Sequence, residues 1–141
     1  MLMCLFYLLK CDCSIKERPI TVYGDGKQVR DVLFVEDLVN ALLMAQRNID
    51  TLCGQAFNIG GGPENTVSLL ELLDLMGELE VPAPHISFGP TRQGDQRYYI
   101  SDYHRFKAAT GWAPTVGVSD GVERLLRWLG QTASRIAVAT S

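Results

Sequence analysis

The sequence has no excess of basic residues and no apolar run long enough to cross a membrane. Its 141 residues include 13 Lys and Arg against 16 Asp and Glu, a formal net charge of −3, whereas nucleic-acid-binding domains usually present a basic stripe. The apolar run of residues 1–9 is far shorter than the roughly 20 residues that span a bilayer. No convincing cleavage site for a signal peptide follows it. We therefore expect a cytoplasmic protein that binds neither nucleic acid nor membrane.

Motifs for a metal site or for histidine-based catalysis are also missing. No cysteine belongs to a C-x-x-C pair, and His85 and His104 are far apart, without an evident acidic or nucleophilic partner. A structural zinc site needs four ligands, so we predict no metal site and expect both histidines at the surface. We interpret the cysteines as free thiols in a reducing compartment, with a metal or redox pair at Cys11-x-Cys13 as the alternative. The four cysteines are Cys4, Cys11, Cys13 and Cys53.

No complete dinucleotide-binding turn is present either. Residues 60–62 are three glycines after an expected strand, but Asn65 stands where the motif G-x-G-x-x-G requires its third glycine. We interpret these glycines as the exit of a strand. The pair Tyr-x-x-x-Lys occurs twice, as Tyr23 with Lys27 and as Tyr103 with Lys107. The first pair spans a turn and the second lacks a serine or threonine partner, so we predict neither a cofactor site nor a catalytic residue.

The composition is that of an ordinary globular domain, with 47% hydrophobic and 21% charged residues and no internal repeat. Periodicity and turn residues predict strands at residues 20–23, 32–35, 55–59 and 86–88, and helices at 36–47, 69–76, 102–109 and 119–129. The clearest helix follows the capping box of Ser68 and Glu71. An apolar stripe on the first helix includes Leu38, Leu42 and Ala45. Residues 1–17 are expected to form an apolar helix, residues 18–130 a folded lobe, and residues 131–141 a flexible tail.

Residues 23–37 have the character of a binding loop. Gly24 and Gly26 allow a tight turn and the close approach of a ligand. Gln28 and Arg30 supply hydrogen-bond donors suited to oxygen-rich groups. A plain hairpin turn at Asp25-Gly26 is the alternative.

A second polar loop, residues 89–97, carries Arg92 and Asp95. A guanidinium group suits phosphate oxygens and a carboxylate suits ribose hydroxyls. An ion pair at the surface, which contributes little to stability, is the alternative interpretation of these two residues.

Four ordered motifs resemble one enzyme family. They are Pro-Ile-Thr-Val-Tyr-Gly-Asp-Gly-Lys-Gln-Val-Arg-Asp-Val-Leu-Phe-Val-Glu-Asp-Leu at residues 19–38, Phe-Asn-Ile-Gly-Gly-Gly at 57–62, Thr-Arg-Gln-Gly-Asp-Gln at 91–96 and Gly-Trp-Ala-Pro at 111–114. Together they look like the carboxyl-terminal part of NAD-dependent nucleotide-sugar epimerases and dehydratases of the extended short-chain dehydrogenase/reductase family. Within that family the resemblance is greatest to the CDP-paratose 2-epimerases.

The resemblance implies a two-part enzyme. In the family, an amino-terminal Rossmann domain holds NAD and the Tyr-x-x-x-Lys pair, and a smaller carboxyl-terminal lobe grips the nucleotide diphosphate. The enzyme oxidises a sugar carbon transiently and returns the hydride to its other face. By the same resemblance, Arg30 pairs with the diphosphate, Tyr23 and Gln28 line the nucleotide end beside Gly24, and Arg92 and Asp95 contact phosphate and ribose.

The implied fold is an α/β (α+β-like) small lobe of short strands and three to four helices, the substrate-binding lobe of this family without its Rossmann domain. We expect a truncated fragment that binds a nucleotide-diphosphate sugar, above all a CDP-sugar, and that neither holds NAD nor catalyses alone. Residues 1–17 would then be a remnant of the missing domain. The alternative is a stand-alone, non-catalytic module that docks on a separate Rossmann-domain chain or forms a homo-oligomer. A purely structural or interaction domain is the third class.

Overall fold

The computed structural model describes residues 19–82 and 84–139, with side chains up to residue 131. The helix expected at residues 1–17 and the cysteines at positions 4, 11 and 13 lie outside the described residues. Within them, Cys53 is a free and exposed thiol.

Two small β-sheets form the strand layer of the lobe. In the first sheet, β1 (Ile20–Tyr23) pairs in parallel with β4 (Ile86–Gly89), with Ile20 opposite Ile86. In the second, β2 (Val29–Asp31) lies between β3 (Thr66–Ser68), which is antiparallel to it, and β5 (Tyr98–Tyr99), which is parallel. Because β1 and β2 belong to different sheets, the loop between them joins the two sheets. The hairpin interpretation of this loop is therefore wrong.

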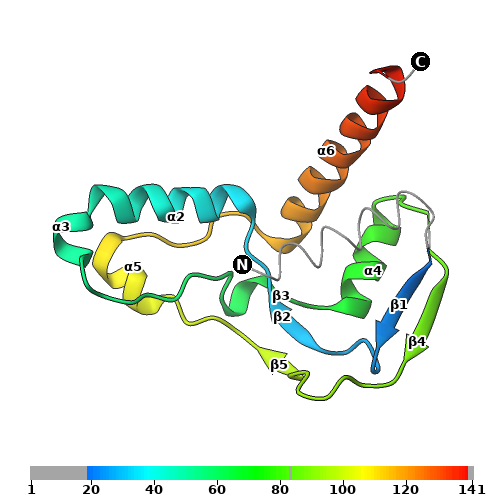
Figure 1. Ribbon diagram of the computed structural model, residues 1–141, viewed down its shortest axis with the longest axis horizontal. Helices are drawn as coiled ribbons and strands as arrows, with labels where there is room; N and C mark the ends of the chain where they lie inside the picture. The colour runs from blue at the N-terminus through cyan, green and yellow to red at the C-terminus, as the bar shows by residue number, and fades with distance from the viewer. Residues whose placement is uncertain (1–18, 83, 140–141) are drawn as a thin grey trace.

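The helices lie at two ends of the strand layer (Figure 1). They are α2 (Val35–Arg47), α3 (Ile49–Leu52), the 3-10 helix η1 (Pro63–Asn65), α4 (Leu69–Glu78), α5 (His104–Thr110) and α6 (Val118–Ala139). Helices α2, α3 and α5 gather at one end, α4 packs near β1 and β4, and α6 projects from the body. The described residues thus form a small α/β lobe, as predicted, with five α-helices instead of three to four, because the single turn of α3 follows α2.

Two hydrophobic clusters hold these elements together. The first joins strands β1 and β3 to helices α4 and α6, and its buried members are Ile20, Val22, Val67, Leu69, Leu72, Met76 and Val122. The second joins α2, α3 and α5, and its buried members are Ala41, Leu52, Tyr103, Phe106 and Trp112. Three aromatic rings of the second cluster meet edge to face at centroid distances of 5.7 Å, a preferred arrangement for aromatic pairs.

Several local predictions are confirmed and others are wrong. The strand at residues 20–23 and the helices at 36–47 and 69–76 are present. The strand predicted at residues 32–35 is wrong, because the paired strand β2 ends directly before it, at Asp31. The Val32 N–H donates to Asn65 O, but residues 32–34 belong to no strand. Residues 55–59 form no strand. The backbone of residues 131–139, expected as a tail, belongs to α6.

The capping box that begins α4 is formed as predicted. The Glu71 N–H donates to Ser68 Oγ at 3.2 Å, and the Ser68 N–H donates to Glu71 Oε2 at 2.7 Å. Hydrogen bonding to Ser68 holds the pKa of the Glu71 carboxyl below its usual value. The ionised Glu71 carboxylate therefore stabilises the fold at neutral pH, and this stabilisation is lost as the pH falls through the lowered pKa of Glu71.

Replacing Ser68 with alanine should lower the free energy of unfolding by about 1 kcal/mol, because a helix N–H loses its acceptor. Urea unfolding at neutral pH, followed by circular dichroism, measures the change. The matched control is Ser87→Ala on the exposed face of β4, for which we expect less than about 0.5 kcal/mol. Equal losses in the two variants would show that the cap does not stabilise α4.

Candidate functional site

A polar cluster forms where the β1–β2 loop meets the β4–β5 loop. The pairing of β1 with β4 and of β2 with β5 brings these two loops together. Gly24 lies at the contact, with a φ of 79° that favours glycine. Its N–H donates to Gly89 O at 3.0 Å, and a Cβ at this position would lie 3.4 Å from Thr91 Oγ1. The two polar loops of the sequence therefore form one cluster.

Asp95 is the centre of the cluster, because its carboxylate contacts two residues of the other loop. Arg30 Nη2 lies 2.9 Å from Asp95 Oδ1, in a pair whose side chains are 15% and 29% exposed. Gln28 Nε2 donates to Asp95 Oδ2 at 3.2 Å and to Tyr23 O at 2.7 Å. Arg30 Nη1 also donates to Val29 O at 2.8 Å. The guanidinium and the amide are thus held in fixed positions.

Arg92 completes the cluster by stacking on Tyr23. Its guanidinium carbon lies 3.7 Å from the centroid of the tyrosine ring, within the range of a cation–π contact. Among the described residues, Arg92 has no ion-pair partner, whereas Arg30 has Asp95. The two guanidinium groups outnumber the single carboxylate between them, so the cluster favours an anionic ligand.

One atom of the cluster is a buried acceptor without a donor in the described part of the chain. Gln28 Oε1 is shielded from solvent and accepts no hydrogen bond there. Its amide orientation follows from Nε2, which faces two oxygen acceptors. A buried polar atom normally has a partner. Gln28 Oε1 is therefore an acceptor that the described residues leave unused.

All six residues chosen from the sequence lie in this cluster: Tyr23, Gly24, Gln28, Arg30, Arg92 and Asp95. Tyr99 was missed. It is the register partner of Arg30 across β2 and β5, so both side chains lie on one face, and it is 46% exposed. The sequence contains no signal for this neighbour, because the pairing of β2 with the two-residue β5 has no local pattern.

The other residues that were considered for catalysis lie outside the polar cluster. Tyr103 is buried against Trp112 in the second cluster. His104 was expected to lack an acidic partner, and this is wrong, since its Nδ1 lies 2.7 Å from Asp102 Oδ1. The backbone N–H of His104, and then its side chain, lower the pKa of Asp102 by hydrogen bonding. Both side chains are exposed, and the Asp102 carboxylate accepts the backbone N–H of His104 at the start of α5.

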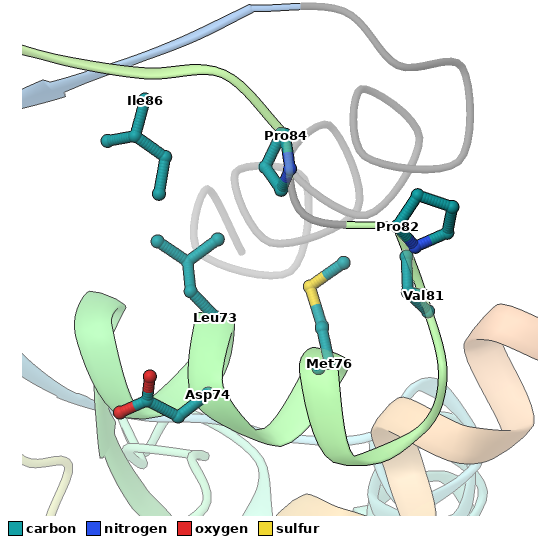
Figure 2. A pocket seen from close by; sticks show the side chains of 8 residues that line it. Leu73, Asp74, Met76, Val81, Pro82, Pro84 and Ile86 are labelled. Atoms are coloured by element: carbon teal, nitrogen blue, oxygen red, sulfur yellow. The ribbon is translucent and has the colours of Figure 1, made fainter.

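Neither a metal centre nor a membrane span is found in the described part of the chain. Its His, Cys, Asp and Glu residues nowhere gather in threes that could bind a metal ion. None of its helices combines the length and the apolar character needed to cross a bilayer. A pocket of about 170 Å³ beside α4 has mainly apolar walls, which include Leu73, Met76 and Ile86 (Figure 2). Asp74 is the acidic residue at this pocket, which shares no lining residue with the polar cluster.

Comparison with known proteins identifies similar sequences. Residues 9–60 match the model of the NAD dependent epimerase/dehydratase family. The chain is 39% identical over 111 residues to CDP-paratose 2-epimerase of Salmonella typhi, which covers 79% of this chain and 33% of the relative. It is 33% identical over 113 residues to UDP-glucuronic acid decarboxylase 1 of Arabidopsis thaliana, covering 80% of this chain and 25% of the relative.

Solved structures share the fold. UDP-glucose 4-epimerase from Thermotoga maritima, solved with UDP-glucose, superposes with a TM-score of 0.77 at 27% identity, over 91% of this chain and 40% of that protein. MoeE5, solved with UDP-glucose and NAD, gives a TM-score of 0.81 at 28% identity, over 91% of this chain and 42% of that protein. The chain therefore spans a third or less of these two curated relatives and about two fifths of these two solved proteins.

Proposed function

We propose that this chain, a homologue of the carboxyl-terminal part of NAD-dependent nucleotide-sugar epimerases and dehydratases, binds the nucleotide-diphosphate portion of a sugar nucleotide and does not catalyse alone. The observation that carries the proposal is the contact of Asp95 with Arg30 and Gln28, next to Arg92 stacked on Tyr23. It joins two cations, a carboxylate and a buried amide acceptor without a partner among the described residues in one cluster. A nucleotide diphosphate combines the groups that these side chains recognise.

Each side chain has a role that its contacts support. Arg30 donates hydrogen bonds to Val29 O and to the Asp95 carboxylate. Its remaining N–H groups are left to bind phosphate oxygens. Arg92, without an ion-pair partner in the described residues, binds the second phosphate. Asp95 has acceptor capacity left for a ribose hydroxyl. Gln28 Oε1 accepts an N–H or O–H from the nucleoside.

The nucleotide is proposed to be a cytidine diphosphate. The support is the 39% identity to a CDP-paratose 2-epimerase, the highest among the relatives compared above. UDP is the competing ligand, since the solved structures that share the fold bind UDP-glucose. The free thiol of Cys53 accords with the reducing cytoplasm, where we place the protein.

The glycines at residues 60–62 do not fit a dinucleotide-binding turn. A dinucleotide turn needs glycines that leave room for the pyrophosphate at a helix N-terminus. Here residues 60–62 are buried, and Cβ atoms at these positions would collide with Ser101, with Val32 O and with the Tyr103 ring. These glycines serve internal packing, so residues 60–62 do not provide the turn that would hold a pyrophosphate.

Calorimetric titration with CDP and with CDP-sugars tests the proposal. We expect binding by the native chain, and a loss of about tenfold to a hundredfold in affinity for Arg30→Ala, because a hydrogen bond to a charged group contributes about 1.5–3 kcal/mol. Arg92→Ala should weaken binding in the same direction. Arg127→Ala is the matched control, since this arginine is paired with Glu123 on α6, away from the cluster.

Two results would contradict the proposal. Absence of binding to CDP, UDP and their sugars by the native chain would refute the ligand class. NAD-dependent epimerisation by the 141-residue chain alone, detected by following the sugar epimers chromatographically, would refute the statement that it does not catalyse alone.

A further inference from the structure

The loop between β4 and β5, residues 90–97, is held at its middle by charge. It has no buried residue. Backbone hydrogen bonds to the β1–β2 loop fix its two ends, at Gly89 O and at Arg97 O. Between these ends, the ion pair of Asp95 with Arg30 crosses to the β1–β2 side of the polar cluster. The contact of this loop with Arg30 therefore depends on charged side chains and not on apolar packing.

This ion pair places a carboxylate on the same guanidinium that is proposed to bind phosphate. Asp95 Oδ1 lies 2.9 Å from Arg30 Nη2, and both side chains are largely shielded from water. Their attraction is therefore screened less than that of an exposed pair. At this distance the carboxylate neutralises the charge of the guanidinium and repels an approaching phosphate oxygen. Asp95 thus competes with phosphate for Arg30.

The competition has a different outcome for a ligand that carries hydroxyl groups. Each oxygen of the Asp95 carboxylate accepts one hydrogen bond, Oδ1 from Arg30 and Oδ2 from Gln28. A carboxylate has about four acceptor sites, so about two remain for further donors. A ribose supplies hydroxyl donors to these sites, whereas inorganic pyrophosphate brings negatively charged oxygens that the carboxylate repels. A nucleoside diphosphate therefore satisfies Arg30 and Asp95 together.

We infer that Asp95 is a specificity-determining residue, an internal anion that excludes inorganic phosphate and pyrophosphate from Arg30 and admits a phosphate that is joined to a ribose. The inference rests on the proposed function, because it takes Arg30 as the phosphate-binding cation. It adds a class of ligand that the site rejects. It also gives the contact between Asp95 and Arg30 a role in the ligand-free chain.

Calorimetric titration with sodium pyrophosphate and with CDP, at one pH and one ionic strength, provides the test. Asp95→Asn keeps the shape of the side chain and removes its charge. Its affinity for pyrophosphate should rise about fivefold or more, because the phosphate no longer meets a competing carboxylate. Its affinity for CDP should not rise, because the hydrogen bonds of the ribose to a charged acceptor are lost. The preference for CDP over pyrophosphate should therefore fall.

Asp25→Asn is the matched control, because it removes the same charge from the neighbouring loop. Asp25 Oδ2 lies 3.3 Å from Arg97 Nη2, and both side chains are exposed. Water screens such a pair, so we expect the affinity for pyrophosphate to change less than about twofold. In a chain that already carries Arg30→Ala, Asp95→Asn should bring no gain, since the carboxylate acts through Arg30. Circular dichroism checks that each variant is folded.

The outcomes separate this inference from the proposed function. An Asp95→Asn variant that binds pyrophosphate no better than the native chain would overturn the inference, and binding of CDP by the native chain would then leave the proposed function standing. Equal gains from Asp95→Asn and Asp25→Asn, a gain that persists without Arg30, or an equal gain for CDP would also overturn it. A gain for pyrophosphate in a protein whose native chain binds neither CDP nor UDP would refute the proposed ligand and confirm that Asp95 competes with phosphate.

Discussion

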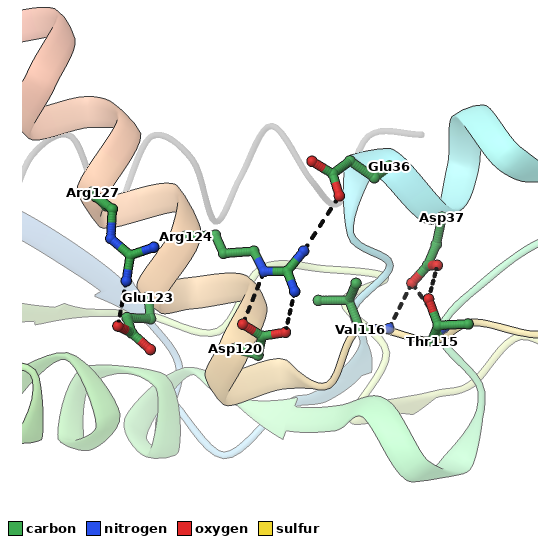
Figure 3. Close-up of polar contacts among 8 residues, drawn as sticks. All are labelled: Glu36, Asp37, Thr115, Val116, Asp120, Glu123, Arg124 and Arg127. Atoms are coloured by element: carbon green, nitrogen blue, oxygen red, sulfur yellow. Dashed lines mark hydrogen bonds and ion pairs between the residues drawn. The ribbon is translucent and has the colours of Figure 1, made fainter.

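Replacing Asp37 with alanine is expected to lower the free energy of unfolding by about 3–5 kcal/mol. The side chain is 2% exposed and accepts three hydrogen bonds from the segment before α6 (Figure 3). Thr115 Oγ1 donates to Oδ1 at 2.7 Å, and the N–H groups of Thr115 and Val116 donate to Oδ2 at 3.0 and 2.9 Å. Alanine would leave these donors without an acceptor. Since the total free energy of unfolding of a small domain is about 5–15 kcal/mol, the midpoint of urea unfolding should fall markedly.

Asp120→Ala is the matched control for this prediction. Asp120 also bonds a neighbouring side chain, Arg124 at 2.8 Å, but its carboxylate is exposed, so we expect a loss below about 1 kcal/mol. Asp37→Asn should give an intermediate loss, because one oxygen acceptor remains while the amide NH₂ faces a donor. If Asp37→Ala costs no more than Asp120→Ala, the carboxylate does not hold the segment before α6.

The role of Asp37 could not be predicted from the sequence. Its position in the first turn of a helix suggests an acid that complements the helix dipole. The structure instead directs it to Thr115, 78 residues later, and the Asp37 carbonyl accepts from Trp112 Nε1 at 3.2 Å. Both contacts depend on how the segment before α6 folds back on α2. No local pattern contains that information.

Predictions succeeded where the cause is local. The capping box of Ser68 and Glu71 begins α4 because both partners lie within one turn. The apolar run at residues 32–35 was misassigned because a short apolar run suits either a strand or the start of a helix. Here residues 32–34 connect β2 to α2, which begins at Val35.

The polar cluster could be predicted only in part. Residue chemistry and the family resemblance selected Arg30 and Asp95 as ligand contacts, but not their mutual contact at 2.9 Å. That contact follows from the parallel pairing of β2 with β5, which joins segments far apart in the chain. The periodicity of α2 likewise predicted an apolar face without saying which partner covers it. Leu42 is exposed, and the small Ala41 faces the core next to Trp112.

The three glycines at residues 60–62 resemble a cofactor turn in sequence but act as packing residues, and the second largest effect is expected there. Gly61→Ala should lower the free energy of unfolding by about 3 kcal/mol or more, because a Cβ at this position would lie 2.0 Å from Val32 O. The neighbouring backbone has little freedom to move, since the Val32 N–H donates to Asn65 O at 2.8 Å and the new Cβ would also lie 2.9 Å from Asn65 Cβ. Thermal and urea unfolding by circular dichroism measure the loss.

Gly77→Ala makes the same chemical change with the opposite expected sign. Gly77 lies inside α4, and a Cβ added there would meet no atom within 4 Å, so alanine should stabilise the protein by up to about 1 kcal/mol through its higher helix propensity. The pair therefore separates close packing from the general effect of replacing glycine. A Gly61→Ala variant within about 0.5 kcal/mol of the native protein would mean that residues 60–62 are not tightly packed, and would reopen the question of whether they can approach a pyrophosphate.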